Sequence, residues 1–168
     1  MSYQEKRTIT SMITMALVLG AYCIYAFGKY QAGAVVADDL KFWATTMLIF
    51  IGIGIVAGIV IQIVFHILIS IGIAVKAKVM DVNKDDKEIE RSIEAEMVED
   101  ERDKLIDQKS MMVGFAIAGF GFVAGLVSLV LNYSPMVMLN IMFISFSAGS
   151  ILEGFVQLYF YRRGIAHG

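Results

Sequence analysis

Four polar side chains lie inside two of the most apolar stretches of this chain, and their types could support chemistry. Gln62 and His66 are four residues apart, and Glu153 and Gln157 repeat that spacing at an offset of 91 residues. A carboxyl group and an imidazole can carry protons, and amides can hold a polar ligand by hydrogen bonds. An ionisable group in a membrane segment is costly, so Glu153 is expected to face other helices, to pair or to be protonated.

Small residues precede each polar pair at the same spacing. The first stretch carries Gly54 and Gly58, and the second carries Ser145 and Gly149. Residues four apart lie along one ridge of a helix, and ridges of small residues let membrane helices approach closely. We therefore expect the two helices to cross at Gly58 and Gly149, with the four polar residues gathered into one cluster beside the crossing.

The predicted cluster has more than one possible role. Polar side chains between membrane helices commonly form interhelical hydrogen bonds worth about 0.6–2 kcal/mol each. The same groups could instead bind a lipid headgroup, a small hydrophobic ligand or a proton, and His66 and Gln157 could simply reach out to the membrane interface. Ser11 and Thr14 of the first apolar stretch lie at comparable depth and are expected to join the cluster.

Composition indicates a membrane protein. Apolar residues make up 58% of the chain and charged residues 18%, whereas soluble domains are about 25% charged. Residues 80–109 alone hold 12 of the 16 acidic residues, so one acidic segment separates two apolar halves. The sequence contains no basic stripe with interleaved aromatic residues, so it does not indicate nucleic-acid binding. Cys23 is the single cysteine, so the chain can form neither a disulfide framework nor a cysteine metal site.

The apolar stretches predict four spans. They cover about residues 8–27, 42–66, 111–131 and 136–159, and each reaches the roughly 20 residues that a bilayer requires. The second stretch contains no turn-forming residue before about residue 79, so its helix is expected to continue that far or to lie in the interface there. The sequence thus predicts an all-α, four-helix membrane bundle of two similar hairpins, 1–79 and 110–168, joined by a partly helical acidic connector, 80–109.

The distribution of basic residues predicts the orientation. One side of the spans is flanked by Lys6, Arg7, Lys76, Lys78, Lys104, Lys109, Arg162 and Arg163, and the other side only by Lys29 and Lys41. Basic residues favour the cytoplasmic side, which predicts cytoplasmic termini and connector. Aromatic residues expected at the outer interface are Tyr22, Tyr25, Tyr30, Trp43 and Tyr133. Two parallel hairpin repeats also imply a pseudo-twofold axis along the membrane normal.

Two further segments suggest contacts. Gly121 and Gly125 form a close-packing motif of the third span, usable within the bundle or in a homodimer. The acidic connector is expected to be solvated or to dock a cytoplasmic protein, with candidate residues Asp100, Glu101, Arg102 and Asp103. This element should extend the third helix and pack Leu105 and Ile106 on its neighbours. The stripe of Ile89, Ile93 and Met97 predicts a short amphipathic helix, capped by Asn83, Asp85 or Asp86.

Four short segments carry a family resemblance. They are Lys6-Arg7-Thr8, Phe42-Trp43, Asp100-Glu101-Arg102-Asp103-Lys104-Leu105-Ile106 and Tyr159-Phe160-Tyr161-Arg162-Arg163-Gly164. In these the chain resembles a group of uncharacterised small bacterial membrane proteins with four spans. The resemblance implies this topology in the bacterial inner membrane, and it implies no activity and no catalytic residues.

The expected function is non-enzymatic. Standard catalytic signatures such as G-x-S-x-G and H-E-x-x-H do not occur, and nothing in the sequence calls for a cofactor or a metal. We expect a membrane protein, in contact with lipids, that senses or binds a lipid or small hydrophobic ligand at Gln62, His66, Glu153 and Gln157. The alternative is a proton- or cation-coupled transporter subunit that uses Glu153, and an intramembrane enzyme is the third possibility.

Overall fold

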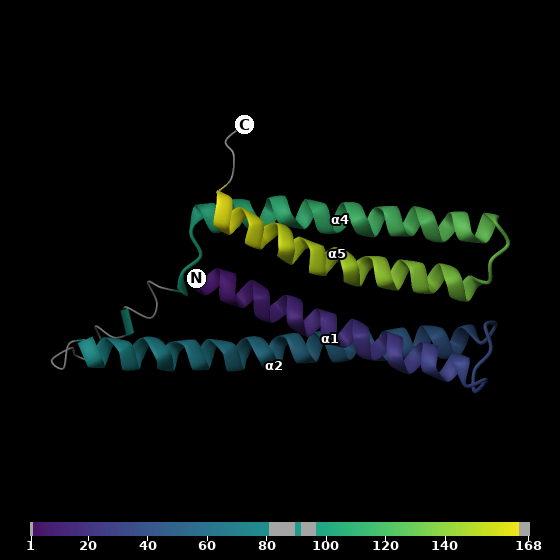
Figure 1. The fold of residues 1–168 in the computed structure, drawn as a ribbon, viewed down its shortest axis with the longest axis horizontal. Coiled ribbons are helices and arrows are strands. Elements are labelled where there is room, and N and C mark those ends of the chain that lie inside the picture. Colours follow the sequence, from purple (N-terminus) through teal and green to yellow (C-terminus); the bar gives the residue numbers. More distant parts are fainter. Residues whose placement is uncertain (1, 81–89, 92–96, 165–168) are drawn as a thin grey trace.

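The structure is a computed structural model that describes residues 2–80, 90–91 and 97–164. Its elements are four long helices, α1 (Tyr3–Gln31), α2 (Leu40–Met80), α4 (Glu101–Val130) and α5 (Pro135–Arg163) (Figure 1). All four are long and apolar enough to cross a membrane. The predicted all-α class with four candidate spans is therefore confirmed.

Helix α2 is a single uninterrupted helix of 41 residues. Apolar residues run through it without a proline or a turn-forming cluster, so nothing in the sequence ends the helix before Met80. At 1.5 Å per residue it is about 60 Å long, roughly twice the thickness of the hydrocarbon core of a bilayer. Residues 67–79 thus continue the second helix, which was one of the alternatives that the sequence left open.

The helices form two hairpins that open toward the same end. The α1–α2 and α4–α5 turns lie at one end, and the start of α1, the end of α2, the start of α4 and the end of α5 point toward the other (Figure 1). We call these the turn end and the terminal end. Helix α5 packs along α4 and also contacts α1, whereas α2 packs mainly on α1 and touches α5 less.

These contacts do not follow the predicted twofold symmetry. A twofold axis would relate the α1–α5 contact to an equivalent contact between α4 and α2, and within the described residues α4 and α2 have no comparable contact. The expected symmetric pair of hairpins is therefore wrong at the level of packing. The physical reason is that α4 and α5 share a long small-residue interface, and α1 and α2 do not.

Glycines set the close approach of α4 to α5. A Cβ atom added at Gly149 would lie 2.7 Å from the carbonyl oxygen of Gly114, and one added at Gly121 would overlap the Ser145 side chain. The buried face of α4 consists mostly of small residues, namely Ser110, Gly114, Ala118, Gly121, Gly125 and Ser128. This is the interface that ridges of small residues favour.

The predicted crossing of the second and fourth spans at Gly58 and Gly149 is wrong. A Cβ atom at Gly58 would meet nothing within 4 Å, and one at Gly54 would meet only Val18 of α1, at 3.7 Å. A small-residue ridge permits close packing without choosing a partner. Gly149 packs on Gly114 because the hairpin turn brings α4 beside α5 along its whole length.

The aromatic core lies at the turn end. Tyr22 and Trp43 are fully buried there together with Ala26, Met47 and Met136. The Tyr22 hydroxyl donates a hydrogen bond of 2.7 Å to Asn140 Oδ1, which joins α1 to α5. Two residues expected in an interfacial belt are thus core residues, while the other three are exposed, namely Tyr25, Tyr30 and Tyr133.

The start of α4 is a capped helix end. Asp100 is the N-cap, and its side chain and that of Asp103 form a reciprocal capping box. The predicted extension of the third helix is confirmed; Ile106 is fully buried, but Leu105 is exposed. The expected amphipathic helix at Ile89 and Ile93, with caps at Asn83, Asp85 or Asp86, lies outside the described residues.

Candidate functional site

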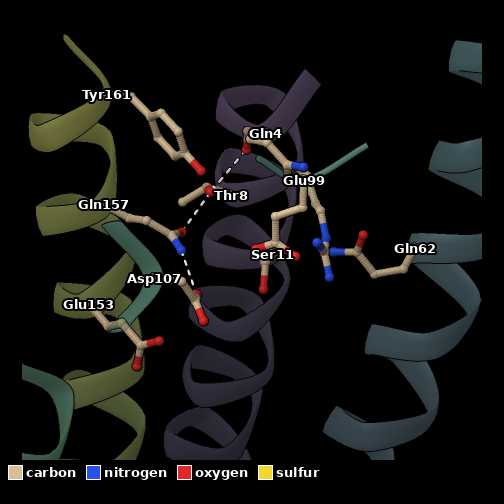
Figure 2. Close-up of a pocket in the computed structure, with 10 residues that line it drawn as sticks. Gln4, Thr8, Ser11, Gln62, Glu99, Asp107, Glu153, Gln157 and Tyr161 are labelled. Atoms are coloured by element: carbon tan, nitrogen blue, oxygen red, sulfur yellow. Dashed lines mark hydrogen bonds between the residues drawn. The ribbon is translucent and has the colours of Figure 1, made fainter. Parts of the chain in front are cut away.

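A cavity of about 450 Å³ lies among the four helices toward the terminal end, and we call it the polar cavity (Figure 2). All its lining residues are polar or charged. Helices α1 and α2 contribute Gln4, Arg7, Thr8, Ser11 and Gln62. The rest of the chain contributes Glu99, Asp107, Glu153, Gln157 and Tyr161. Its volume lies in the range of small-molecule pockets, about 300–1,000 Å³.

Helical spacing brings these side chains to the cavity. On α1, Gln4, Thr8 and Ser11 follow one another at steps of four and three residues, so they share one face. On α5, the step from Glu153 to Gln157 is again four residues. In Figure 2, α1 lies between α5 and α2, with Glu153 and Gln157 of α5 on one side and Gln62 of α2 on the other.

One side of the cavity is held by a chain of hydrogen bonds. The Thr8 hydroxyl donates to Gln157 Oε1 at 2.7 Å, and Gln157 Nε2 donates to Asp107 Oδ1 at 2.8 Å (Figure 2). These bonds connect α1, α5 and α4. Because Gln157 uses both ends of its amide, it is a positioning residue of the wall rather than a free ligand group.

Other groups in the cavity lack partners. Gln62 Oε1 is buried and accepts no hydrogen bond from the residues that the structure describes. Glu153, Glu99 and Arg7 form no hydrogen bond or ion pair with any other residue that the structure describes. A half-buried cavity that keeps such groups unpaired is well suited to a polar ligand, since buried polar groups in proteins are normally hydrogen-bonded.

Glu153 owes its position to a glycine. A Cβ atom added at Gly114 of α4 would lie 2.7 Å from Glu153 Oε2. The carboxyl group therefore packs over the backbone of α4, in space that exists only because residue 114 has no side chain. The glycines of α4 thus serve both the helix interface and the site.

The structure brings together three of the four predicted cluster residues. Gln62, Glu153 and Gln157 line the polar cavity, and so does Ser11. His66 does not line it; its Nε2 is hydrogen-bonded to the Tyr3 hydroxyl at the start of α1. Thr14 is also outside the cavity, because its buried hydroxyl donates to the Thr10 carbonyl oxygen.

The acidic element at the start of α4 forms local contacts. Asp100 and Asp103 cap the helix, which gives both a structural role. Glu101 forms an exposed ion pair with Lys104 at 3.2 Å, and Arg102 is exposed. A cytoplasmic partner at this element stays a prediction.

Several residues that line the polar cavity are not among those predicted from the sequence. Gln4, Arg7 and Thr8 lie just before the first apolar stretch, where polar residues are expected in any membrane protein. Asp107 and Tyr161 flank the third and fourth stretches in the same way. The signal that could have found them is the stripe of polar residues at three- and four-residue steps, continuing Ser11 of α1 and Glu153 of α5 toward the terminal end.

A second cavity, of about 570 Å³, follows along α1, α2 and α5 toward the turn end. We call it the apolar cavity, because its lining consists of apolar side chains and one glycine, except for Ser147 and Ser150. The change of character is abrupt. On α5, Glu153 lines the polar cavity and Ser150 the apolar one; on α1, Ser11 lines the polar cavity and Met15 the apolar one.

No protein family, curated protein or solved structure matches this chain. The resemblance to small four-span bacterial membrane proteins therefore stays a prediction. Among the described residues, no group of histidine, cysteine and carboxylate side chains is arranged to hold a metal ion. The two cavities and their lining are therefore the features that bear on function.

Proposed function

We propose that this chain is a multi-pass membrane protein, with cytoplasmic termini, that binds an amphipathic molecule without chemically transforming it. The observation that carries this proposal is the pair of cavities that succeed one another along the same three helices. The polar cavity would receive the headgroup, and the apolar cavity would receive the hydrocarbon chain.

A membrane setting is supported by the surface of the helices. Large apolar side chains on α2 such as Leu48, Ile55 and Leu68 are exposed by 67%, 59% and 62%. Soluble proteins rarely expose contiguous apolar surface on this scale. The terminal end, which carries most of the basic residues flanking the helices, then faces the cytoplasm.

Binding accounts for the cavities better than transport does. A proton- or cation-coupled transporter that uses Glu153 would need polar groups along a route across the membrane. The cavity next to Glu153 on the same helices is instead lined almost entirely by apolar side chains. That lining suits a hydrocarbon chain, which supports the binding proposal.

The single tryptophan offers a direct test. Trp43 packs in one cluster with Met47, and Met47 lines the apolar cavity. The protein would be reconstituted in phosphatidylcholine nanodiscs and titrated with bromoundecanol, whose terminal bromine quenches tryptophan fluorescence at short range. We expect saturable quenching of Trp43, because a chain in the apolar cavity brings the bromine close to it.

Two glycines on α2 provide matched variants. Gly54 lines the apolar cavity, whereas Gly52 is exposed and a Cβ atom there would meet nothing within 4 Å. Gly54→Leu should abolish the saturable quenching by filling the cavity, and Gly52→Leu should preserve it. Quenching that never saturates, or that is equal in the two variants, would overturn the proposal.

A further inference from the structure

We infer that the headgroup bound in the polar cavity is a primary ammonium, so that the preferred ligand is a cationic amphiphile whose amine is attached close to its hydrocarbon chain. The inference rests on the proposed binding function and specifies its ligand class. It is carried by three acceptor groups that line the polar cavity, one of which, Glu153, lies close to the apolar cavity.

The first of these groups is the Glu153 carboxyl. It lies one helical turn from Ser150, which lines the apolar cavity. It has no hydrogen-bond or ion-pair partner among the described residues. A carboxyl group this close to the apolar cavity is placed to pair with a cation at the point where a hydrocarbon chain begins.

The second and third groups are neutral acceptors. Gln62 Oε1 is buried and unpaired, and the Ser11 side chain also lacks a hydrogen bond in the described part of the chain. All three groups line one cavity, with Ser11 on α1, Gln62 on α2 and Glu153 on α5 (Figure 2). A primary ammonium carries three donors and no acceptor, so it suits a cavity whose lining offers acceptors without partners.

The charge of the cavity points the same way. Of the residues that the structure describes, three carboxyl groups line it, those of Glu99, Asp107 and Glu153, against one guanidinium, that of Arg7. An anionic headgroup such as a carboxylate would be repelled by this surplus, and a cation would be attracted. Repulsion between like charges is an effective way to reject the wrong ligand.

The lining also distinguishes a primary from a quaternary ammonium. A quaternary ammonium donates no hydrogen bonds and is recognised by a cage of aromatic rings. Tyr161 is the one aromatic residue that lines the polar cavity, and it lies about two helical turns from Glu153 toward the terminal end of α5. The cavity therefore offers oxygen acceptors, which bind a primary ammonium, and its described lining lacks the cage of aromatic side chains that binds a quaternary ammonium.

The test is a competition among amphiphiles that share one chain. Wild-type protein in phosphatidylcholine nanodiscs, with Trp43 quenched by bromoundecanol, would be titrated with dodecylamine, dodecanol, dodecanoate and dodecyltrimethylammonium at equal mole fractions in the bilayer. We expect dodecylamine to relieve quenching at a concentration about tenfold lower than dodecanol, as a charge-assisted hydrogen bond provides. The other two should compete least.

Variants assign the preference to the site. Glu153→Gln keeps the size and the hydrogen-bonding ability of the side chain but removes its charge, so the advantage of dodecylamine over dodecanol should disappear. Glu101→Gln is the matched control, since that carboxyl group is 92% exposed and outside the cavity. The advantage should persist in this control.

The outcomes separate the two proposals. If dodecanol, dodecanoate or dodecyltrimethylammonium relieves quenching as well as dodecylamine does, the headgroup inference is overturned while amphiphile binding stands. An advantage that survives Glu153→Gln overturns the inference as well. If bromoundecanol shows no saturable quenching in the wild-type protein, both proposals fail.

Discussion

The backbones of α4 and α5 meet where Gly149 faces Gly114. A Cβ atom at Gly149 would lie 2.7 Å from the Gly114 carbonyl oxygen, closer than real Cβ contacts allow. The same Gly114 leaves room for the Glu153 carboxyl group. One pair of glycines therefore sets both the helix spacing and the position of the charged group of the site.

Replacing Gly149 should separate the two helices. Gly149→Ala places a methyl group against backbone, which cannot rotate away, so we expect a loss of about 1–3 kcal/mol in stability. Gly58→Ala is the control, because a Cβ atom there meets nothing within 4 Å and alanine favours a helix by up to about 1 kcal/mol over glycine. Thermal unfolding in detergent checks both. Equal stability of the two variants would contradict the α4–α5 interface.

A second contact of this interface can be tested by compensation. A side chain at residue 121 would overlap Ser145, so Gly121→Ala should lower the unfolding temperature. Adding Ser145→Gly removes the overlapping atoms and should restore part of the loss, with a coupling of about 0.5–3 kcal/mol. Gly119→Ala, in open space on α4, should change little. Strictly additive losses would show that residues 121 and 145 do not touch.

The hydrogen bond between Tyr22 and Asn140 should contribute to stability. Tyr22→Phe leaves Asn140 Oδ1 without its donor in a buried position, and the expected cost is about 1 kcal/mol. Tyr25→Phe is a suitable control, since Tyr25 is 48% exposed. Chemical denaturation of the reconstituted protein measures the difference. No difference between the two variants would mean that the buried bond adds nothing.

Two buried serines of α4 should respond in opposite ways. The Ser110 hydroxyl is fully buried and has no hydrogen-bond partner in the part of the chain that the structure describes, so Ser110→Ala should preserve stability or raise it by up to about 1 kcal/mol. Ser128 donates to the Gly125 carbonyl oxygen at 2.6 Å, and Ser128→Ala should lower stability slightly. Both variants keep a small side chain, so the change in unfolding temperature reports the contribution of each hydroxyl group. A clear loss in Ser110→Ala would reveal an unrecognised partner.

The helices of this protein could be predicted from its amino-acid sequence. Long apolar stretches predict four helices because a helix satisfies every backbone hydrogen bond of a chain that crosses a bilayer, and α2 continues to Met80 because no proline or turn-forming cluster interrupts it. Four-residue steps correctly placed Gln62, Glu153 and Gln157 on faces that meet in one cavity. These are local properties of each helix, which periodicity reports.

The packing of one helix against another became apparent only in the tertiary structure. The ridge of Gly54 and Gly58 resembles that of Ser145 and Gly149, yet α5 packs on α4, because α4 presents small residues along its whole buried face. His66 is hydrogen-bonded to Tyr3 and does not line the polar cavity, whereas Arg7 and Asp107, which were not predicted, do line it. Pairing depends on the complementary shape of two surfaces that are distant in sequence, and the spacing within one helix carries no information about its partner.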